Sequence, residues 1–220
     1  MTVRAVLLDV DGTLVDSNDA HAQAWSLALA EVGRRVAYDE IRWRIGKGGD
    51  KLTREVTGID PESDEGKALR ERTGAIFRER FVGDLKAFPQ AHELLARFRD
   101  AGLVLVVATS ASATDMRAIL EATRLAPLID ERTSSSDAPR SKPDPDIIEA
   151  AVEQSGHPAS ACMMLGDTPY DVTAARRAGV RVVGLQCGGW SSEELAGSEA
   201  VYADPAELLA RYEESPFARG

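Results

Sequence analysis

Short apolar segments alternate along this chain with segments of helical periodicity, and this alternation restricts the possible fold more than any other feature. The apolar segments that we interpret as strands are residues 3–8, 103–108, 161–165 and 180–185, with weaker candidates at 129–132 and 201–202. Continuous apolar character is typical of strands buried on both faces. Three helical segments between them start at Pro and end at Gly, namely 89–102, 145–156 and 169–179. The pattern predicts an α/β fold with a doubly wound, Rossmann-like parallel sheet.

The alternation is interrupted once, after the first predicted strand. The interrupted interval contains helical patterns only, at residues 18–32, 38–44, 50–56 and 64–81. An insert at this point would lie above the carboxyl edge of the sheet, where open α/β folds bind their ligands. We therefore interpret residues 17–88 as an all-helical cap domain over the active site, and residues 1–16 and 89–220 as the core domain.

Charge and composition restrict the partners. The net charge of −10 in 220 residues argues against nucleic acid or an anionic membrane as the main partner. No apolar run approaches the roughly 20 residues that span a bilayer, and the start of the chain lacks the cleavage region of a signal peptide. Cys162 and Cys187 are too few for a disulfide framework. We expect a cytoplasmic monomer or homodimer that acts on a small molecule.

Two aspartates follow the first predicted strand. Asp9 and Asp11 are two residues apart, so the alternation of an extended chain directs both side chains to one side. Carboxylates this close repel each other, and a metal ion, a shared proton or a cationic side chain has to compensate them. The alternative is a purely structural role, in which Asp11 starts an Asx-type turn into Gly12.

Two hydroxyl residues follow the predicted strand at 103–108. Thr109 and Ser110, together with free amides at a helix start, would form a receptor for an anion. Ser and Thr are also frequent helix caps, so a cap at Ser112 or Thr114 is the simpler interpretation of this segment. Alone, the segment does not establish a phosphate site.

Later polar residues stand at other predicted strand or loop ends. Pro143 disfavours the helical conformation for the residue before it, Lys142, so the Lys142 side chain would project from a stiff loop. The alternative is that Lys142 is an ordinary solvent-exposed lysine. Asp167 follows an apolar strand and Asp171 lies in the first turn of the next helix. Carboxylate oxygens that converge at one edge of a sheet suit Mg²⁺, which also bridges to phosphate.

In this order, the four motifs resemble those of the haloacid dehalogenase-like (HAD) hydrolase superfamily, in the phosphatase and phosphomutase subgroup with a helical cap of the C1 type. The resemblance extends over essentially the whole chain. It implies that Asp9 attacks phosphorus and forms an aspartyl-phosphate, and that Asp11 is the general acid and base. It also implies that Asp9, the main-chain carbonyl of Asp11 and Asp167 ligate Mg²⁺. Asp171 would ligate the metal or orient a metal-bound water.

The resemblance assigns the remaining core residues to the phosphate group. Thr109, Ser110 and Lys142 would hold the phosphoryl oxygens. The second aspartate, Asp11, distinguishes phosphate-ester chemistry from the dehalogenase branch, because a halide leaving group needs no proton. A dianionic phosphate that approaches an anionic nucleophile needs a divalent cation and an ammonium nearby, and the motifs supply residues for both.

The cap carries the specificity residues. His21 and Trp25 share one face of the first cap helix; we expect Trp25 in the core and His21 either buried or facing the cavity. The glycine-rich, basic loop around Lys47 and Gly48 would offer amides and an ammonium to a substrate, unless it is only a helix connector. Sugar-phosphate mutases hold the second phosphate of their substrate with an arginine in this part of the cap. This chain has Gly49 at about the position where that arginine is expected.

The expected activity is Mg²⁺-dependent hydrolysis of a small phosphate monoester, such as a sugar phosphate or a phosphoglycolate-like acid, through an aspartyl-phosphate. The alternative is a sugar phosphomutase of the β-phosphoglucomutase type, for which His21 is the best feature. A third possibility is a phosphate-binding protein without turnover. The sequence leaves the identity of the substrate and the oligomeric state open.

Overall fold

The sheet has the predicted parallel, doubly wound form. The computed structural model describes residues 2–218, so the predicted core limits at residues 1 and 220 lie outside the described residues. The six strands within this range are β1 (Ala5–Leu8), β2 (Val104–Ala108), β3 (Glu131–Thr133), β4 (Cys162–Gly166), β5 (Arg181–Leu185) and β6 (Ala200–Tyr202). Their order is β3-β2-β1-β4-β5-β6, and all neighbouring pairs are parallel. The carboxyl ends of β1 and β4 therefore lie side by side at the point where the winding reverses, which is where such folds bind ligands.

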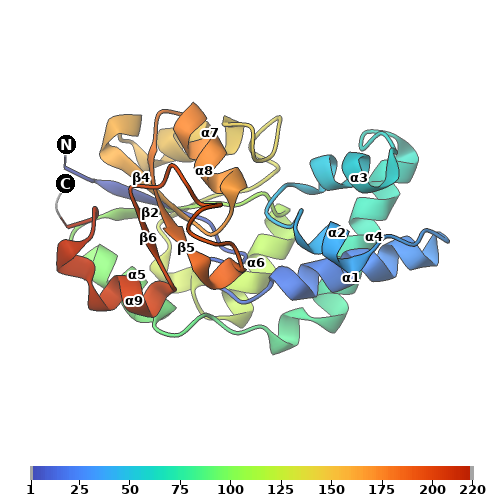
Figure 1. Ribbon diagram of the computed structural model, residues 1–220, viewed down its shortest axis with the longest axis horizontal. Helices are drawn as coiled ribbons and strands as arrows, with labels where there is room; N and C mark the ends of the chain where they lie inside the picture. Colours follow the sequence, from blue (N-terminus) through green and yellow to red (C-terminus); the bar gives the residue numbers. More distant parts are fainter. Residues whose placement is uncertain (1, 219–220) are drawn as a thin grey trace.

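Helices cover both faces of the sheet (Figure 1). They are α5 (Ala91–Asp100), α6 (Ala113–Ala122), α7 (Asp146–Ser155), α8 (Pro169–Arg177) and α9 (Pro205–Ala210). Because successive residues of a strand face opposite sides, Leu7 joins the apolar layer of α7 and α8, whereas Leu8 joins the layer that contains α5, α6 and α9. Both side chains are fully buried. The fold-class prediction is confirmed, and its physical basis is burial of the strands on both faces.

The predicted helix starts are correct to within two residues. Pro169 is the first residue of α8, and Pro145 immediately precedes α7. The predicted start at Pro89 is wrong by two residues, because Gln90 adopts a left-handed conformation with φ 59° and α5 begins after it. Gly156 ends α7 with a φ of 70°, a conformation that glycine adopts without steric cost.

The cap segment is helical, as expected. Its elements are α1 (Asn18–Glu31), α2 (Tyr38–Arg42), α3 (Gly49–Thr57), α4 (Asp64–Arg80) and the short 3-10 turn η1 (Val82–Asp84). They lie beyond the carboxyl edge of the sheet (Figure 1). The two segments that connect them to the core run side by side, since the Asp16 amide donates to the Lys86 carbonyl (3.0 Å) and the Phe88 amide to the Leu14 carbonyl (2.9 Å). The assignment of residues 17–88 to a separate domain stays a prediction.

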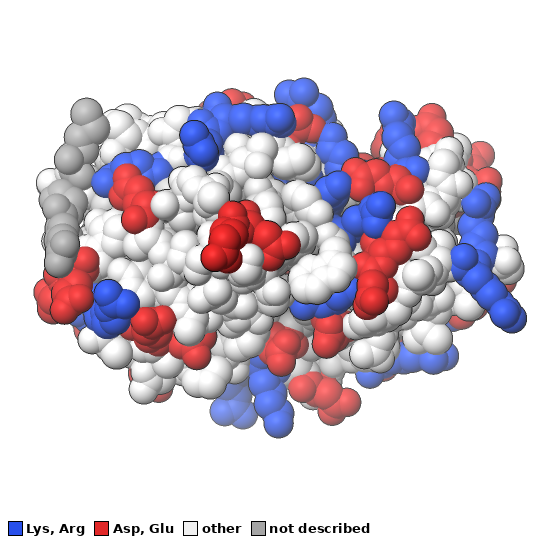
Figure 2. Space-filling model, in the orientation of Figure 1, with Lys and Arg blue, Asp and Glu red and all other residues white. Residues whose placement is uncertain are grey.

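The described surface has mixed charge. On the face shown in Figure 2, Lys and Arg side chains are interspersed with Asp and Glu, so this face lacks the continuous basic surface typical of nucleic-acid binding. None of the described helices has both the length and the apolar character needed to cross a membrane. Both cysteines are free thiols; Cys162 is buried in β4 and Cys187 is partly buried.

Candidate active site

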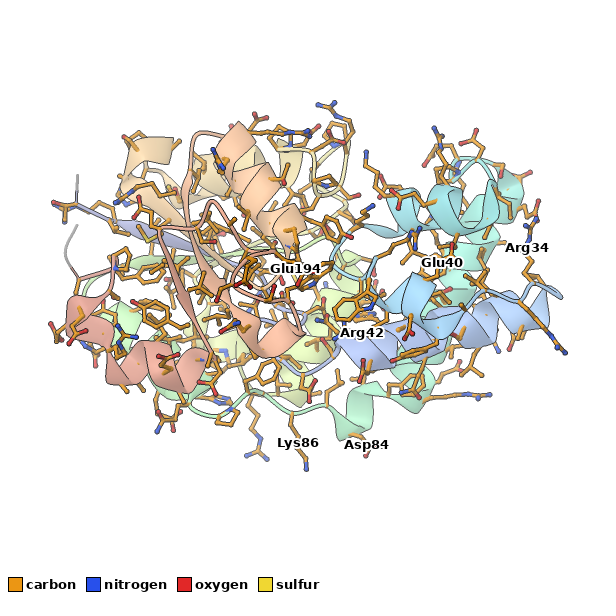
Figure 3. The ribbon with its side chains drawn as sticks, viewed as in Figure 1. Arg34, Glu40, Arg42, Asp84, Lys86 and Glu194 are labelled. Carbon is orange, nitrogen blue, oxygen red and sulfur yellow. The ribbon has the colours of Figure 1, made fainter. Side chains whose placement is uncertain are left out.

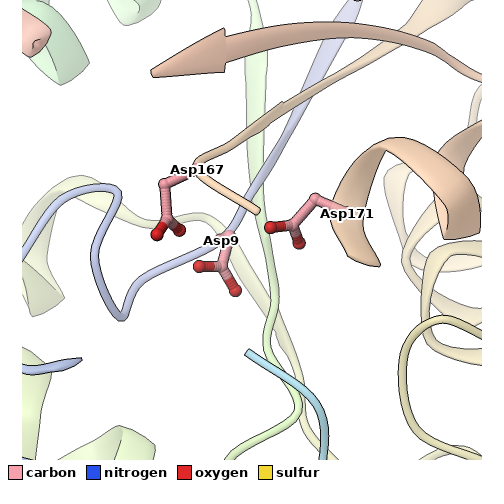
Figure 4. Close-up of side chains that lie close together, drawn as sticks. All are labelled: Asp9, Asp167 and Asp171. Atoms are coloured by element: carbon pink, nitrogen blue, oxygen red, sulfur yellow. The ribbon is translucent and has the colours of Figure 1, made fainter. Parts of the chain in front are cut away.

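Three buried carboxylates meet at the carboxyl edge of the sheet (Figure 4). Asp9 follows β1, Asp167 follows β4, and Asp171 lies in the first turn of α8. Each offers a carboxylate oxygen, and these atoms lie within 4.8 Å of one another. The adjacency of β1 and β4 places Asp9 beside Asp167, and the short turn into α8 brings in Asp171. Three carboxylate oxygens at this spacing form a donor set that fits a hard divalent cation such as Mg²⁺.

Two glycines allow the close approach to Asp167. A Cβ atom at Gly188 would lie 1.6 Å from Asp167 Oδ2, and one at Gly12 would lie 2.3 Å from the same oxygen. The Thr13 hydroxyl is a donor to this group, at 2.8 Å from Asp167 Oδ1 and 3.2 Å from Asp9 Oδ2. The Asp-Gly-Thr sequence after β1 therefore supplies both the space and a hydrogen bond that hold the carboxylates in place.

The ammonium of Lys142 compensates part of this negative charge. Its Nζ lies 2.6 Å from Asp9 Oδ1 and 2.7 Å from Asp171 Oδ1, and the side chain is only 1% exposed. Burial alone would lower the pKa of Lys142, but the carboxylates of Asp171 and Asp9 outweigh it and raise the pKa above its ordinary value. The lysine is therefore charged, and it does not lie free in solvent.

One ammonium does not balance three buried carboxylates. Burial, reinforced by Asp171 and Asp11 and opposed by Lys142, raises the pKa of Asp9 to about 7. Burial and the neighbouring Asp9 and Asp171 raise the pKa of Asp167 well above its ordinary value. Both pKa shifts have the same cause, because holding buried, mutually repelling carboxylates in their ionised form costs free energy. A divalent cation among the three carboxylates would offset this cost.

Asp11 lies at the same cavity but has different partners. Its Oδ1 accepts a hydrogen bond from Ser17 Oγ (2.5 Å) and lies 2.8 Å from His21 Nε2. Burial would raise the pKa of Asp11, but His21 and Ser17 lower it below its ordinary value, while Asp11 raises the pKa of His21 against the effect of burial. The His21 ring stacks on Phe77 with a centroid distance of 3.8 Å. The pair therefore favours an imidazolium beside a carboxylate, and Asp11 has its own cationic partner outside the cluster of Asp9, Asp167 and Asp171.

A cavity of about 170 Å³ lies between this edge of the sheet and the cap. Asp9 and Asp11 line its core side together with Thr109 and Ser110, and Trp25 lines its cap side while staying buried, as expected. The cavity thus brings together the predicted nucleophile Asp9, the predicted acid–base residue Asp11 and the predicted hydroxyl segment.

The hydroxyl segment is held by local hydrogen bonds. Thr109 Oγ1 accepts from the Ala111 amide (3.1 Å), and Ser110 Oγ accepts from the Lys142 amide (3.3 Å). Ser112 caps α6 by accepting from the amide of Asp115 (3.1 Å). The capping interpretation therefore holds for Ser112, whereas Thr109 and Ser110 precede the helix and line the cavity.

The cap loop reaches the core, but its charged atom is engaged elsewhere. Lys47 lines the cavity, yet its Nζ lies 2.8 Å and 2.7 Å from the two carboxylate oxygens of Glu55. The Gly48 amide donates to Ser141 Oγ (3.2 Å) and so connects the cap to the residue before Lys142. Of the three predicted cap residues, His21 contacts a predicted catalytic side chain, Asp11, at 2.8 Å. Roles for Lys47 and Gly48 in specificity stay predictions.

Two residues that contact this region were not predicted from the sequence. Asn18 Nδ2 donates to Asp167 Oδ2 (3.2 Å) and to the Gly188 carbonyl (3.5 Å). Arg42, labelled in Figure 3 at the junction of cap and core, donates to the same carbonyl (2.9 Å) and pairs with Asp19 (2.6 Å). No local sequence signal marks these contacts, because Asp167 and Gly188 are more than 140 positions away from Asn18 and Arg42 along the chain.

Comparison with known proteins identifies the family of the chain. Residues 3–179 match the haloacid dehalogenase-like hydrolase family. The chain belongs to this family. The phosphoglycolate phosphatase of Caulobacter vibrioides is 30% identical over 202 residues, covering 89% of this chain and 85% of that protein. "Protein CbbY, plasmid" of Cupriavidus necator is 29% identical over 232 residues, covering 96% and 90%. A crystal structure of a hydrolase from Pseudomonas syringae matches with a TM-score of 0.88 at 32% identity, covering 96% and 98%. The resemblance seen in the sequence is confirmed, and the chain is a hydrolase of this HAD-like class.

Proposed function

We propose that this hydrolase is a Mg²⁺-dependent phosphatase that cleaves a small phosphate monoester through an aspartyl-phosphate on Asp9. One observation carries the proposal: a buried triad of Asp9, Asp167 and Asp171, compensated by Lys142, lies beside a cavity that also contains a second aspartate. The relatives named phosphoglycolate phosphatase support a phosphate monoester as the substrate.

The metal would lie among the three carboxylates. Asp9, Asp167 and Asp171 would hold it, and the main-chain carbonyl of Asp11 stays a predicted further ligand. When bound, Mg²⁺ would supply positive charge that offsets the phosphoryl oxygens and the buried carboxylates.

The chain's own residues account for the first displacement. A carboxylate oxygen of Asp9 forms a bond to phosphorus while the ester P–O bond breaks. Lys142, the Thr109 hydroxyl and the Ser110 amide hold the phosphoryl oxygens, because positioning and charge stabilisation are the main requirements of phosphoryl transfer. The departing alkoxide takes a proton from Asp11 and leaves as an alcohol.

The contact between His21 and Asp11 would supply that proton. The lowered pKa of Asp11 and the raised pKa of His21 favour the proton on His21 before substrate binds. A dianionic phosphate beside Asp11 raises the proton affinity of its carboxylate, and the proton then moves to Asp11. In the second step a water molecule gives a proton to Asp11 and its oxygen forms a bond to phosphorus. The bond between phosphorus and the Asp9 oxygen breaks at the same time. Inorganic phosphate leaves and the Asp9 carboxylate is restored.

Phosphate release from a panel of small phosphate monoesters, with Mg²⁺ or with EDTA, tests the proposal. We expect release with Mg²⁺ only, and no detectable release by Asp9→Asn. Asp100→Asn, at an exposed position at the end of α5, is the matched control and retains activity. Absence of Mg²⁺-dependent release from every ester, or full activity of Asp9→Asn, would contradict the proposal.

A sugar phosphomutase is the second candidate, and the His21–Asp11 contact is the observation in its favour. It would isomerise a sugar phosphate and be stimulated by a bisphosphate, whereas the phosphatase releases inorganic phosphate without either effect. Gly49 in place of the expected Arg argues for the phosphatase. The cytoplasmic location and the monomeric or homodimeric state stay predictions.

A further inference from the structure

The cap contacts the residue that precedes Lys142 in the core. The Ser141 hydroxyl accepts a hydrogen bond from the Gly48 amide (3.2 Å) and donates one to Asp50 Oδ1. Gly48 is the N-cap residue of α3, and Asp50 lies in the first turn of that helix. Ser141 is 91 positions further along the chain than Asp50, and its side chain is buried. These two hydrogen bonds therefore connect the start of a cap helix to the segment that carries the Lys142 ammonium.

The two segments fit together closely. A Cβ atom at Gly48 would overlap with the Ser141 side chain and would lie 2.6 Å from Asp50 Oδ1. The absence of a side chain at Gly48 therefore allows α3 to approach Ser141 at this distance. In the sequence the Gly48 amide was a candidate donor to a substrate; in the folded protein this amide is bonded to Ser141 instead.

A second cap contact follows Lys142 in the chain. The ammonium of Lys51, also in α3, lies 2.5 Å from Asp144 Oδ2. The core contacts Asp144 through Arg140 (3.8 Å) and Arg177 (3.6 Å), whose side chains are more than half exposed. Long ion pairs of exposed side chains contribute little. The contact with Lys51 is the shortest of the three, so α3 contacts this loop both before and after Lys142.

The Lys142 ammonium has to be placed accurately. Its Nζ lies 2.6 Å from Asp9 Oδ1 and 2.7 Å from Asp171 Oδ1, and the Lys142 amide donates to Ser110 Oγ (3.3 Å). A shift of the Ser141 backbone would move the adjacent Lys142 with it. Phosphoryl transfer depends mainly on positioning and charge stabilisation, and a misplacement of about 1 Å can reduce a rate by about 100-fold. The contacts of α3 with this loop therefore bear on the binding of a phosphoryl group.

We propose that Asp50 is a positioning residue that acts through Ser141 to place the Lys142 ammonium for the phosphoryl group. This inference rests on the proposed phosphatase function, in which Lys142 holds phosphoryl oxygens. Asp50 is not among the residues that line the cavity, so it acts without touching the substrate. Because Asp50 belongs to the cap and Lys142 to the core, docking of the cap and binding of phosphate each strengthen the other, as thermodynamic linkage requires.

Calorimetric titration of the Mg²⁺-loaded protein with inorganic phosphate tests the proposal without turnover. We expect Asp50→Ala and Ser141→Ala each to bind phosphate about tenfold more weakly than the parent. Asp50→Asn keeps an acceptor oxygen for the Ser141 hydroxyl, so it should lose less than about threefold. Tyr170→Phe is the matched control, because it removes a different hydrogen bond between core and cap, from the Tyr170 hydroxyl to the Trp43 carbonyl (2.7 Å). We expect this control to keep the affinity of the parent.

A double-mutant cycle distinguishes the positioning of Lys142 from a general loosening of the cap. In Lys142→Met, the additional change Asp50→Ala should weaken phosphate binding by less than about twofold, because the group that Asp50 positions is already absent. An undiminished loss from Asp50→Ala in this background, an equal loss in Tyr170→Phe, or full affinity in Asp50→Ala would overturn the proposal. If Lys142→Met does not fold or binds no measurable phosphate, the comparison of Asp50→Ala with Asp50→Asn and Tyr170→Phe decides by itself.

The positioning role and the phosphatase function fail in different ways. Phosphate binding with the expected losses, but without Mg²⁺-dependent release from any ester, would refute the phosphatase function and leave the role of Asp50 standing. An Asp50→Ala variant that cleaves an ester with the kcat/KM of the parent would overturn the role of Asp50 alone. A parent protein that neither binds phosphate nor cleaves an ester would refute both.

Discussion

Replacing Lys142 by Met removes an ammonium that contacts two buried carboxylates and leaves a side chain of similar length. Lys142 Nζ lies 2.6 Å from Asp9 and 2.7 Å from Asp171. Removing one partner of a buried ion pair leaves an uncompensated charge and costs about 3–5 kcal/mol. We expect Lys142→Met to lose about this much unfolding free energy at pH 8 without metal. Lys51→Met is the matched control; its partner is Asp144 (2.5 Å), but the pair is partly exposed, so we expect a loss of about 0–1 kcal/mol.

The size of the loss should depend on pH and on Mg²⁺. With Lys142 present, the pKa of Asp9 is already about 7. Without the ammonium, which opposes the effect of burial, this pKa is higher still. At pH 5 the carboxyl group then binds a proton in place of the lost cation, and the difference between variant and parent becomes smaller. Mg²⁺ supplies positive charge to the same carboxylates, so it should also reduce the difference at pH 8.

Urea unfolding followed by circular dichroism measures these free energies. It is carried out at pH 5 and pH 8, each with EDTA and with Mg²⁺. Equal losses for Lys142→Met and Lys51→Met at pH 8 in EDTA would refute the argument that the buried charge cluster depends on Lys142. A loss that stays the same at both pH values and with both additives would refute the electrostatic origin.

Three further outcomes follow from the same site. Without metal, Asp9 binds a proton in the folded protein but not in the unfolded chain between its ordinary pKa of 3.8 and about 7. Its contribution to the unfolding free energy should therefore fall by about 4 kcal/mol as the pH rises through this range. Mg²⁺ should abolish this fall, and urea unfolding curves measure it. Asn18→Ala removes a hydrogen bond to Asp167 and should weaken Mg²⁺ binding by about 10- to 100-fold in calorimetry. His21→Gln removes the proton held beside Asp11, so the alkaline limb of the kcat/KM–pH profile should move to lower pH, because a carboxyl group loses its proton before an imidazolium does.

Each of these outcomes has a result that would contradict it. The same pH dependence of the metal-free unfolding free energy in Asp9→Asn as in the parent between pH 4 and pH 7 would contradict the raised pKa of Asp9. Unchanged Mg²⁺ affinity in Asn18→Ala would show that this amide does not position the metal ligand. For the histidine, the control is His92→Gln, because the His92 ring contacts the Thr123 carbonyl (2.9 Å) and neither residue lines the cavity. An equal shift in both histidine variants would exclude a specific role for His21.

The strands and much of the site could be predicted because their signals are local. The predicted strand at residues 3–8 is apolar except for Arg4, and β1 lies within it. Carboxyl ends of parallel strands meet at one edge of a sheet, so Asp9 and Asp167 were expected at the same edge. The pairing of β1 with β4 then makes them neighbours. β3 was poorly marked because two of its three residues, Glu131 and Arg132, are exposed, so it lacks the apolar pattern of a buried strand.

What the sequence alone determined is the type of fold and the candidate residues of the site, since periodicity and strand-end position are properties of neighbouring residues. Only the tertiary structure decided how these residues divide into groups. It pairs Lys142 with Asp9, 133 positions away, and gives Asp11 a different cationic partner, His21. It also packs Arg70 against Gly49, and both residues line the cavity. These contacts depend on how the cap packs against the core and on the direction of individual side chains, and neither is encoded in the spacing of residues along the chain.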